Sequence, residues 1–321
     1  MPSIAFMFPG QGSQSVGMGR ELAAASRAAS AVWAAADAAL GEPISALAWD
    51  GPADRLDLTE NAQPALLAAS IAILAAWRER WTSGRGGSGL APGFAAGHSM
   101  GQYSALVAAG VVSLEAGVRL VRRRGELMQA SGDGRDGAMA ALIGLDDARL
   151  PELVAGAAAH GTFVVANRNA PGQVVVSGER LAIEAGAELA RELGARRAIV
   201  LPVSVAAHSP LMADAAERMR ETLAGIEFQD PSTTLLANAD ARFITTADAA
   251  RAELVEHLTA GVDWVAAVGR MSDAGITTFV EMGPGKVLTG LVKRIAPDAE
   301  VLPADDPASH DRLLDLAAVT A

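Results

Sequence analysis

The sequence contains no cysteine, only two lysines and few aromatic residues, and each shortage excludes something. Without cysteine there is no disulfide, no thiol nucleophile and no Cys-ligated metal. Aromatic residues make up 4% of the chain although 50% of it is hydrophobic, and alanine dominates the hydrophobic residues. We therefore expect thin helices packed at close spacing. The 321 residues are enough for one large domain, or for one with an inserted subdomain.

Long hydrophobic runs and an excess of basic charge are also missing. No stretch approaches the ~20 apolar residues of a membrane-spanning helix. Residues 1–10 have no basic region and too short an apolar run for a signal peptide, so we expect a cytoplasmic protein without a membrane partner. The net charge of −11 argues against nucleic acid as a partner. An anionic partner would have to be met by a local basic patch.

The most informative stretch is Gly97-His98-Ser99-Met100-Gly101, which follows a short apolar run and precedes a helical pattern. In this G-x-S-x-G arrangement a serine sits on a sharp turn between a strand and a helix. The free N–H groups at the start of that helix would stabilise an oxyanion formed at an acylated Ser99. The alternative is a glycine-rich turn whose serine only caps a helix.

Apolar runs alternate with helical patterns through most of the chain. This alternation predicts an α/β fold with a mainly parallel sheet. The expected strands of that sheet include residues 4–8, the run before Ser99, and residues 235–238 and 277–281. A Gly/Ser/Pro-rich surface loop is expected over residues 83–92.

The pattern changes in the middle of the chain. Residues 138–201 read as β-α-β-β-α-β, which is the ferredoxin-like unit. Gly132-Asp133-Gly134 and Pro202 flank this unit and are plausible hinges. We therefore predict a large α/β domain formed by residues 1–131 and 201–321, with residues 132–200 inserted as a ferredoxin-like small subdomain.

A serine nucleophile needs a base, and five histidines are available. His208 is the best candidate because it follows an apolar strand and precedes a helix start. Active sites of open α/β sheets form at such strand ends. His98 is adjacent to Ser99, but neighbouring side chains on a tight turn point apart, so we expect it to orient the turn. His160 and His310 are expected to be exposed.

Five motifs in order resemble the malonyl-CoA:acyl-carrier-protein transacylase family, which includes the acyltransferase domains of polyketide and fatty-acid synthases. They are Phe8-Pro9-Gly10-Gln11-Gly12-Ser13-Gln14, Gly97-His98-Ser99-Met100-Gly101, Arg124-Gly125, His208-Ser209-Pro210-Leu211-Met212 and Glu281-Met282-Gly283-Pro284-Gly285-Lys286. The resemblance covers nearly the whole chain. It implies an α/β-hydrolase-like large domain with a ferredoxin-like insert.

The resemblance also implies a ping-pong mechanism. Ser99, activated by His208, would take malonyl from malonyl-CoA and pass it to the phosphopantetheine thiol of an acyl carrier protein, without a bound cofactor or metal. The backbone N–H groups of Gln11 and Met100 would form the oxyanion hole. Arg124 would hold the malonyl carboxylate in a bidentate pair. For Arg122 and Arg123 the expectation remains a solvated helix face.

Four positions depart from the pattern of the family. Gln102 stands where many members have Glu. His257 stands where Gln or Asn usually supports the catalytic histidine, either through its side chain or through its backbone carbonyl, and Gly261 stands where relatives often have Pro. Ala207 precedes His208, where malonyl-specific synthase domains often have Phe and other members have Ser. Ala207 therefore implies a roomier acyl pocket.

Several functions stay open at this point. The first is malonyl transfer for fatty-acid or polyketide synthesis, by a housekeeping enzyme, a discrete polyketide acyltransferase with another acyl preference, or a malonate-decarboxylase subunit. The second is a hydrolase that clears acyl groups from carrier proteins. The third is a carrier-binding scaffold with a dead site. For docking of an acidic carrier, Lys286, Lys293 and Arg294 are the candidate basic patch.

Overall fold

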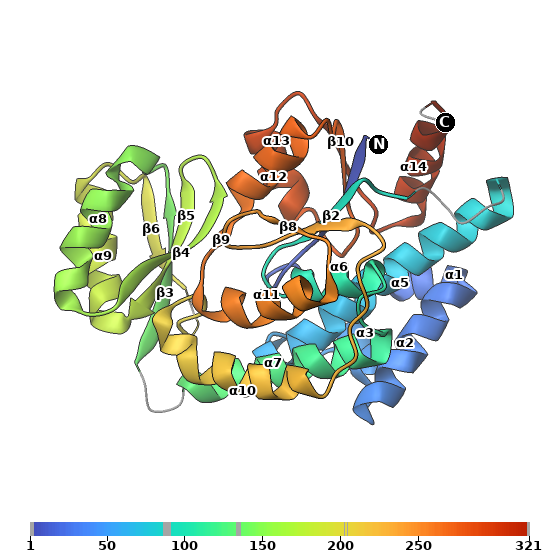
Figure 1. The fold of residues 1–321 in the computed structure, drawn as a ribbon, viewed down its shortest axis with the longest axis horizontal. Helices are drawn as coiled ribbons and strands as arrows, with labels where there is room; N and C mark the ends of the chain where they lie inside the picture. Colours follow the sequence, from blue (N-terminus) through green and yellow to red (C-terminus); the bar gives the residue numbers. More distant parts are fainter. Residues whose placement is uncertain (1–2, 86–90, 133–135, 202, 204, 320–321) are drawn as a thin grey trace.

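The computed structural model describes residues 3–85, 91–132, 136–201, 203 and 205–319, and these form two sheets with helices packed on them (Figure 1). The larger sheet has the strand order β11-β10-β1-β2-β7-β8, and all neighbours are parallel except β7 and β8. Its strands are β1 (Ile4–Phe8), β2 (Phe94–Gly97), β7 (Thr234–Leu236), β8 (Phe243–Ile244), β10 (Thr278–Glu281) and β11 (Glu300–Pro303).

The larger sheet is buried on both faces, which explains why β1 and β2 are continuous apolar runs. Successive side chains of β1 enter different cores: Phe6 packs with one set of helices and Met7 with the other. The first set is α1 (Arg20–Ala25), α2 (Arg27–Leu40), α3 (Ile44–Asp50), α4 (Ala53–Leu56), α5 (Thr59–Arg85), α6 (Gly101–Ala108), α7 (Leu114–Gly132), α10 (Ala213–Ala224) and α11 (Ala247–Thr259). The second set is α12 (Trp264–Asp273) and α13 (Val287–Ile295).

The smaller sheet confirms the predicted ferredoxin-like pattern. Its strands β3 (Gly137–Ile143), β4 (Phe163–Ala170), β5 (Gln173–Glu179) and β6 (Arg197–Val200) are antiparallel, in the order β6-β3-β5-β4. The helices α8 (Leu150–Ala157) and α9 (Arg180–Glu192) connect them, with the short 3-10 turns η1 (Asp147–Arg149) and η2 (Ala158–His160) at the ends of α8. A separate apolar core lies between these helices and the sheet.

A fifth strand of the smaller sheet comes from beyond the predicted insertion. Strand β9 (Val262–Asp263) pairs in parallel with β4, so that Asn167 lies opposite Val262. The sequence pattern did not predict this strand, because two residues are too few to show a period. The division into residues 1–131 with 201–321 and residues 132–200 remains a prediction. Of its proposed hinges, Asp133, Gly134 and Pro202 lie outside the described residues.

Two local predictions were wrong. The surface loop expected from residue 83 begins later, because α5 continues to Arg85. His310 was expected to be exposed, but it is fully buried at the start of α14 (Pro307–Val319), and its Nε2 lies 2.9 Å from the carbonyl of Ala304. Packing of α14 against β11 and α5 buries this polar segment, which local sequence does not reveal. His160 is exposed, as predicted.

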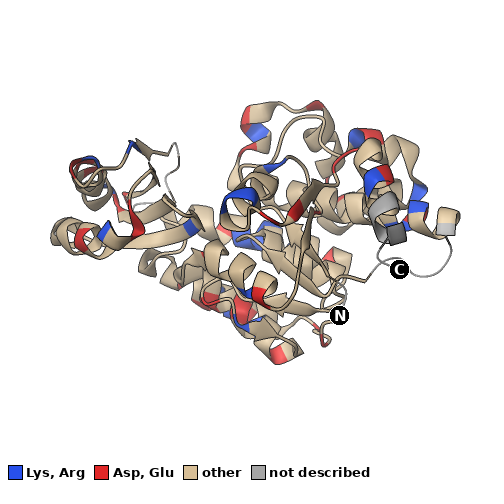
Figure 2. Cartoon of the chain, turned by 90° about the horizontal axis from the view of Figure 1, so that it is seen from above, with Lys and Arg blue, Asp and Glu red and all other residues tan. Residues whose placement is uncertain are grey.

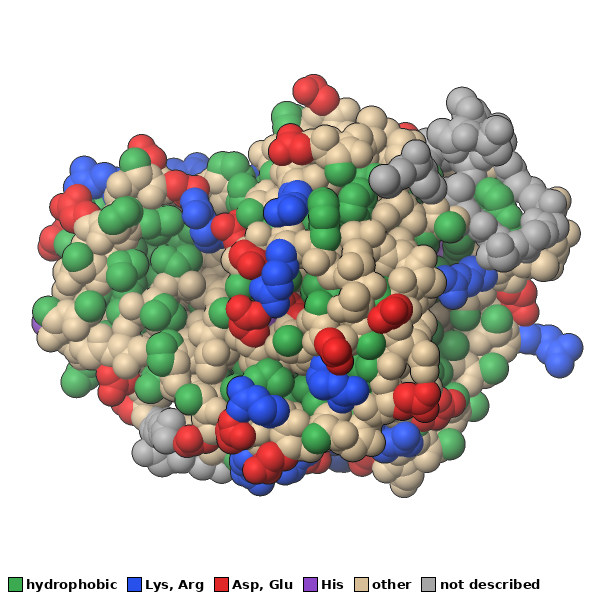
Figure 3. Space-filling model, viewed as in Figure 1, with side chains coloured by type: hydrophobic (Ala, Val, Ile, Leu, Met, Phe, Trp, Pro, Cys, Tyr) green, Lys and Arg blue, Asp and Glu red, His purple; other side chains and the backbone are tan. Residues whose placement is uncertain are grey.

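Charges of both signs are interspersed over the helices, and no large surface of one sign stands out in two views (Figures 2 and 3). Many of them form exposed ion pairs, such as Arg20 with Asp50 at 2.6 Å. Within the described ranges, no helix has the length and apolar character required to cross a membrane.

Candidate active site

Ser99 lies in the turn between β2 and α6, in a backbone conformation that L-residues rarely adopt. Its φ is 53°, in the left-handed region. The glycines of the motif allow the turn to close. A Cβ at Gly97 would lie 2.0 Å from the carbonyl carbon of Gly101, and one at Gly101 would lie 2.1 Å from the oxygen of Phe8. The strained turn therefore requires glycine at both places, and it presents Ser99 at the carboxyl end of β2.

His208 faces the serine hydroxyl. Its Nε2 lies 2.8 Å from Ser99 Oγ, and its Nδ1 lies 2.7 Å from the carbonyl oxygen of His257 and 3.1 Å from that of Ala260. Because carbonyl oxygens only accept hydrogen bonds, Nδ1 carries the proton and Nε2 is free to accept one from Ser99. Burial, followed by the charge of Arg124, lowers the pKa of His208 to about 3. The imidazole is therefore neutral at physiological pH, as a general base must be.

Arg124 brings a buried positive charge to the same hydroxyl. The residue is 1% exposed, and its two terminal nitrogens donate to Gln63 Oε1 at 3.0 Å and to Ser99 Oγ at 3.1 Å. Among the described residues, its Nε has no hydrogen-bond partner and no carboxylate pairs with the Arg124 guanidinium. Burial lowers the pKa of Arg124, yet arginine stays protonated in proteins. A buried cation that has no counter-ion among the described residues and lies beside the Ser99 hydroxyl fits an anionic ligand.

The neighbouring arginines on α7 behave differently. Arg123 is about 38% exposed and pairs with Glu126 of the same helix at 3.2 Å. Arg122 is only 17% exposed; it pairs with Glu42 and donates to Asn61 at 3.0 Å. The solvated-face expectation therefore suits Arg123, whereas Arg122 links α7 to α5 and to the segment between α2 and α3.

The two predicted oxyanion donors flank the turn. Met100 is buried directly after Ser99, at the N-cap of α6. Gln11 is exposed in the loop after β1, where its side-chain amide donates to Thr59 at 3.3 Å. This loop reaches the elbow because Gly10 packs against His98, so closely that a Cβ there would lie 2.6 Å from the His98 oxygen. Neither backbone N–H donates to an acceptor among the described residues, so both remain available to a ligand.

The other predicted residues support the turn or its surroundings. His98 Nε2 lies 2.8 Å from Asn169 Oδ1 of β4, and its ring meets Trp264 edge-on at 5.6 Å. His98 thus connects the elbow with the smaller sheet. Ala207 is partly buried beside His208 and packs on the main core.

The departures from the family pattern have clear structural outcomes. His257 is fully buried and supports His208 through its carbonyl, while neither nitrogen of its own ring has a hydrogen-bond partner in the described part of the structure. A change of side chain at this position therefore leaves the support in place. Gln102 uses both ends of its amide: it accepts from Gly97 N at 3.2 Å and donates to the Leu236 carbonyl at 3.0 Å. A carboxylate could make only the first of these bonds.

Sequence analysis missed two polar residues of the site. Asn238 follows β7, and its Oδ1 accepts the backbone N–H of Ser99 at 2.9 Å. Its position at the carboxyl end of a strand was a usable signal, because such ends meet at one edge of a parallel sheet. Gln63, which holds Arg124, lies in a long helix and gives no comparable signal. Within the described part of the chain, no cluster of His, Asp and Glu could hold a metal ion.

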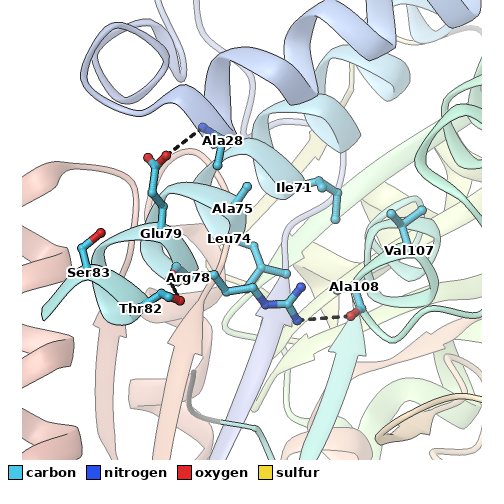
Figure 4. Close-up of a pocket in the computed structure, with 10 residues that line it drawn as sticks. All are labelled: Ala28, Ile71, Leu74, Ala75, Arg78, Glu79, Thr82, Ser83, Val107 and Ala108. Atoms are coloured by element: carbon cyan, nitrogen blue, oxygen red, sulfur yellow. Dashed lines mark hydrogen bonds between the residues drawn. The ribbon is translucent and has the colours of Figure 1, made fainter. Parts of the chain in front are cut away.

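A groove of about 460 Å³ lies away from these residues, between α2, α5 and α6 (Figure 4). Its wall is mainly apolar, with Ile71, Leu74 and Val107 around the side chain of Arg78, which donates to the Ala108 carbonyl at 3.5 Å. None of the predicted site residues lines this groove.

A serine on a strained elbow, a neutral histidine in contact with it and two backbone N–H groups beside it form the arrangement that serine-dependent acyl-transfer enzymes use. The chain matches the acyl transferase domain family over residues 5–309. It is 42% identical over 308 residues to the malonyl CoA-acyl carrier protein transacylase of Bacillus subtilis, an alignment that covers 96% of this chain and 95% of the relative. The chain belongs to the malonyl CoA-acyl carrier protein transacylase family.

Solved structures agree with this assignment. An acyl carrier protein S-malonyltransferase from Vibrio cholerae superposes with a TM-score of 0.92 at 42% identity, covering 97% of this chain and 99% of that one. A malonyl-transacylase solved in complex with a type II polyketide-synthase acyl-carrier protein also superposes with a TM-score of 0.92, at 40% identity over 98% of this chain and 99% of that one.

Proposed function

We propose that this enzyme transfers malonyl from malonyl-CoA to the phosphopantetheine thiol of an acyl carrier protein, through a malonyl ester of Ser99, in fatty-acid or polyketide synthesis. The observation that carries the proposal is the buried guanidinium of Arg124, which has no carboxylate partner among the described residues and donates to Ser99 Oγ. A malonyl group that reaches Ser99 places its free carboxylate close to this cation. The activities of the relatives support the same transfer.

In the first half-reaction, His208 Nε2 takes the hydroxyl proton as Ser99 Oγ attacks the thioester carbonyl. The carbonyl oxygen becomes an oxyanion, for which the N–H groups of Gln11 and Met100 are the donors we propose. When the carbon–sulfur bond breaks, His208 returns the proton to the leaving sulfur, and CoA departs as a thiol. In the second half-reaction, the carrier thiol attacks the serine ester with the same proton transfers in the same order.

The charge of Arg124 also couples acyl recognition to the strength of the base. It is the second cause, after burial, of the low pKa of His208. A malonyl carboxylate paired with Arg124 would neutralise much of this charge, so the pKa of His208 would rise when that substrate binds. An acetyl group would produce no such change. We therefore propose that Arg124 selects malonyl both by binding its carboxylate and by making His208 more basic in the complex.

Ala207 belongs to this proposal as the residue that widens the acyl pocket beside His208. The proposal also includes a cytoplasmic location, malonyl-CoA as a substrate rather than a resident cofactor, and the division of the chain into a large domain and an inserted subdomain over residues 132–200.

Intact-mass measurement with a panel of acyl-CoAs tests the function. After exposure to malonyl-CoA, the protein should gain one malonyl unit, and Ser99→Ala should gain nothing. Acetyl-CoA should label the enzyme much more slowly. An adduct that persists in Ser99→Ala would refute the assignment of the nucleophile, and equal labelling by all acyl-CoAs would refute the role of Arg124.

A further inference from the structure

The mechanism above makes no use of Glu253, although this carboxylate lies near its centre. Glu253 is on α11 and is fully buried. Its Oε1 accepts the backbone N–H of Asn238 at 2.7 Å and the side-chain Nδ2 of Asn238 at 3.3 Å. A buried carboxylate is costly unless it is hydrogen-bonded and paired, so the partners of Glu253 indicate what it does in the fold.

The bonds of Asn238 connect Glu253 to the nucleophile. Its Oδ1 accepts the N–H of Ser99 at 2.9 Å, while its Nδ2 faces Glu253. The amide has only one orientation that satisfies both neighbours, because Ser99 N–H can only donate and an ionised Glu253 can only accept. Glu253 therefore fixes which end of Asn238 points to Ser99. Asn238 in turn holds the N–H of a residue whose φ of 53° is strained.

The same helix also supports the base. One turn after Glu253, the carbonyl of His257 accepts the Nδ1–H of His208 at 2.7 Å. Helix α11 thus holds the serine through Glu253 and Asn238, and the histidine through its own backbone. Both members of the dyad lie in the left-handed region, since the φ of His208 is 58°. A single rigid element therefore keeps two strained residues in hydrogen-bonding distance of each other.

We propose that Glu253 is a positioning residue for acyl transfer: acting through Asn238, it sets the backbone of Ser99 and aligns it with His208. This inference rests on the proposed function for the role of Ser99. At its outer end Glu253 contacts Arg242, whose guanidinium lies 3.3 Å from Oε2 and also pairs with Asp240 and Glu256. The resulting series of contacts runs from the protein surface through Arg242, Glu253 and Asn238 to Ser99.

The ionisation of Glu253 should make the rate of Ser99 acylation depend on pH. Burial raises the pKa of Glu253 to about 7, against the opposing effect of Asn238 and Arg242. Among the described residues, Asp240, Tyr103 of α6 and His257 also interact with Glu253, and the Nδ1 of His257 lies 3.7 Å from Oε1. Glu256 of the same helix pairs with the Arg242 that contacts Glu253. As the pH falls through about 7, Glu253 takes up a proton and its bonds to Asn238 lose their charge-assisted strength. Acylation of Ser99 should then slow.

The test measures the first-order rate of Ser99 acylation at saturating malonyl-CoA, over pH values on both sides of the Glu253 pKa. Wild type should show an inflection near pH 7. His208 is present in both wild type and Glu253→Gln, so an inflection caused by His208 would persist in that variant. Glu253→Gln keeps an oxygen for Asn238 and cannot ionise, so the inflection should disappear while the plateau rate stays within roughly tenfold. Glu253→Ala removes the acceptor and should slow acylation by about 10- to 100-fold, with little change in KM.

A matched control separates positioning from general destabilisation. Glu281 is equally buried, accepts N–H groups from Leu288 and Thr289 of α13, and also has a pKa raised by burial. Glu281→Gln should therefore leave the inflection of the wild type in place. In a double-mutant cycle, the Asn238→Ala/Glu253→Ala variant should be acylated no more slowly than Asn238→Ala alone, because both substitutions break the same hydrogen-bonded connection to Ser99.

A second probe keeps this inference separate from the proposed function. Sulfonylation of Ser99 by phenylmethylsulfonyl fluoride needs an aligned serine and histidine but no malonyl group. Its rate should follow the same order among the variants. If no acyl-CoA acylates the wild-type protein, the proposed function is rejected. The sulfonylation rates of the variants then decide whether Glu253 positions Ser99. Glu253→Gln with an unchanged inflection, or Glu253→Ala with wild-type rates toward both reagents, would overturn the inference.

Discussion

Replacing Arg124 by alanine should convert the enzyme from a malonyl-selective to an unselective acyltransferase. The Arg124 side chain is 1% exposed, and its donors point to Gln63 and Ser99. Because the site is buried, water cannot take over the hydrogen bonds of the lost guanidinium to a bound carboxylate. Loss of one partner of a buried, hydrogen-bonded charge pair costs about 2–5 kcal/mol. That range corresponds to a decrease of roughly 30- to 5,000-fold in kcat/KM for malonyl-CoA.

Acetyl-CoA should respond in the opposite sense or hardly at all. It has no carboxylate to lose a partner, and removal of the Arg124 charge raises the pKa of His208 toward its ordinary value. The assay compares kcat/KM for the two thioesters in wild type, in Arg124→Ala and in the control Arg123→Ala. Arg123 is partly exposed and its ion-pair partner among the described residues is Glu126, away from Ser99, so its variant should behave as wild type. Equal losses for malonyl-CoA and acetyl-CoA in Arg124→Ala would show that the arginine only holds the fold.

Three other residues or pairs give distinct outcomes. His208→Ala should slow acylation by ~10²–10⁴-fold, and a loss below tenfold, measured by quenched-flow mass spectrometry, would point to another base. Because the pKa of His208 is about 3 in the folded protein and near 6.5 in the unfolded chain, wild type should lose stability as the pH falls through this window. Urea unfolding of His208→Gln should show a smaller loss; an equal loss would contradict the low pKa. Ala207→Phe should reduce kcat/KM for bulky acyl-CoAs more than for malonyl-CoA, and a uniform change would exclude Ala207 from the pocket. Reversing the charges of the exposed Lys286 and Lys293 should raise KM for the carrier protein, less so at high salt, while acylation by malonyl-CoA is retained; a fall in both half-reactions would place docking elsewhere.

The third member of that predicted docking patch is already engaged in the fold. Arg294 donates to the carbonyl of Pro171 at 2.6 Å and to the side chain of Gln173, both in the hairpin between β4 and β5. It therefore joins α13 to the smaller sheet. Lys286 precedes α13 as its N-cap and Lys293 lies in its last turn, and both lysines are exposed.

Sequence alone predicted those features of the site that depend on local chain geometry. Gly97 and Gly101 identify the elbow because no other residue fits where their Cβ atoms would lie. His208 could be selected because a strand end in a parallel sheet has a known relation to the active site. The two-sheet architecture was predictable for a similar reason, since the order of strands and helices differs between the two parts of the chain.

What the sequence could not predict depends on contacts between distant segments. Asn238 contacts Ser99 because β7 lies beside β2, and Glu253 of α11 contacts Asn238; neither residue belongs to a recognisable local motif. Strand β9 joins the smaller sheet through two residues, fewer than any periodic pattern needs. The exposure of His310 was predicted wrongly because burial there comes from the packing of α14.

The most direct test of the central claim follows both half-reactions on the intact protein. The enzyme is first acylated with malonyl-CoA, freed of excess thioester and then mixed with a carrier protein, either with its phosphopantetheine arm or without it. The account predicts that the malonyl mass leaves Ser99 and appears on the carrier only when the arm is present. Release of free malonate in both mixtures would instead identify a hydrolase, and a malonyl unit retained on the enzyme would contradict the proposed transfer.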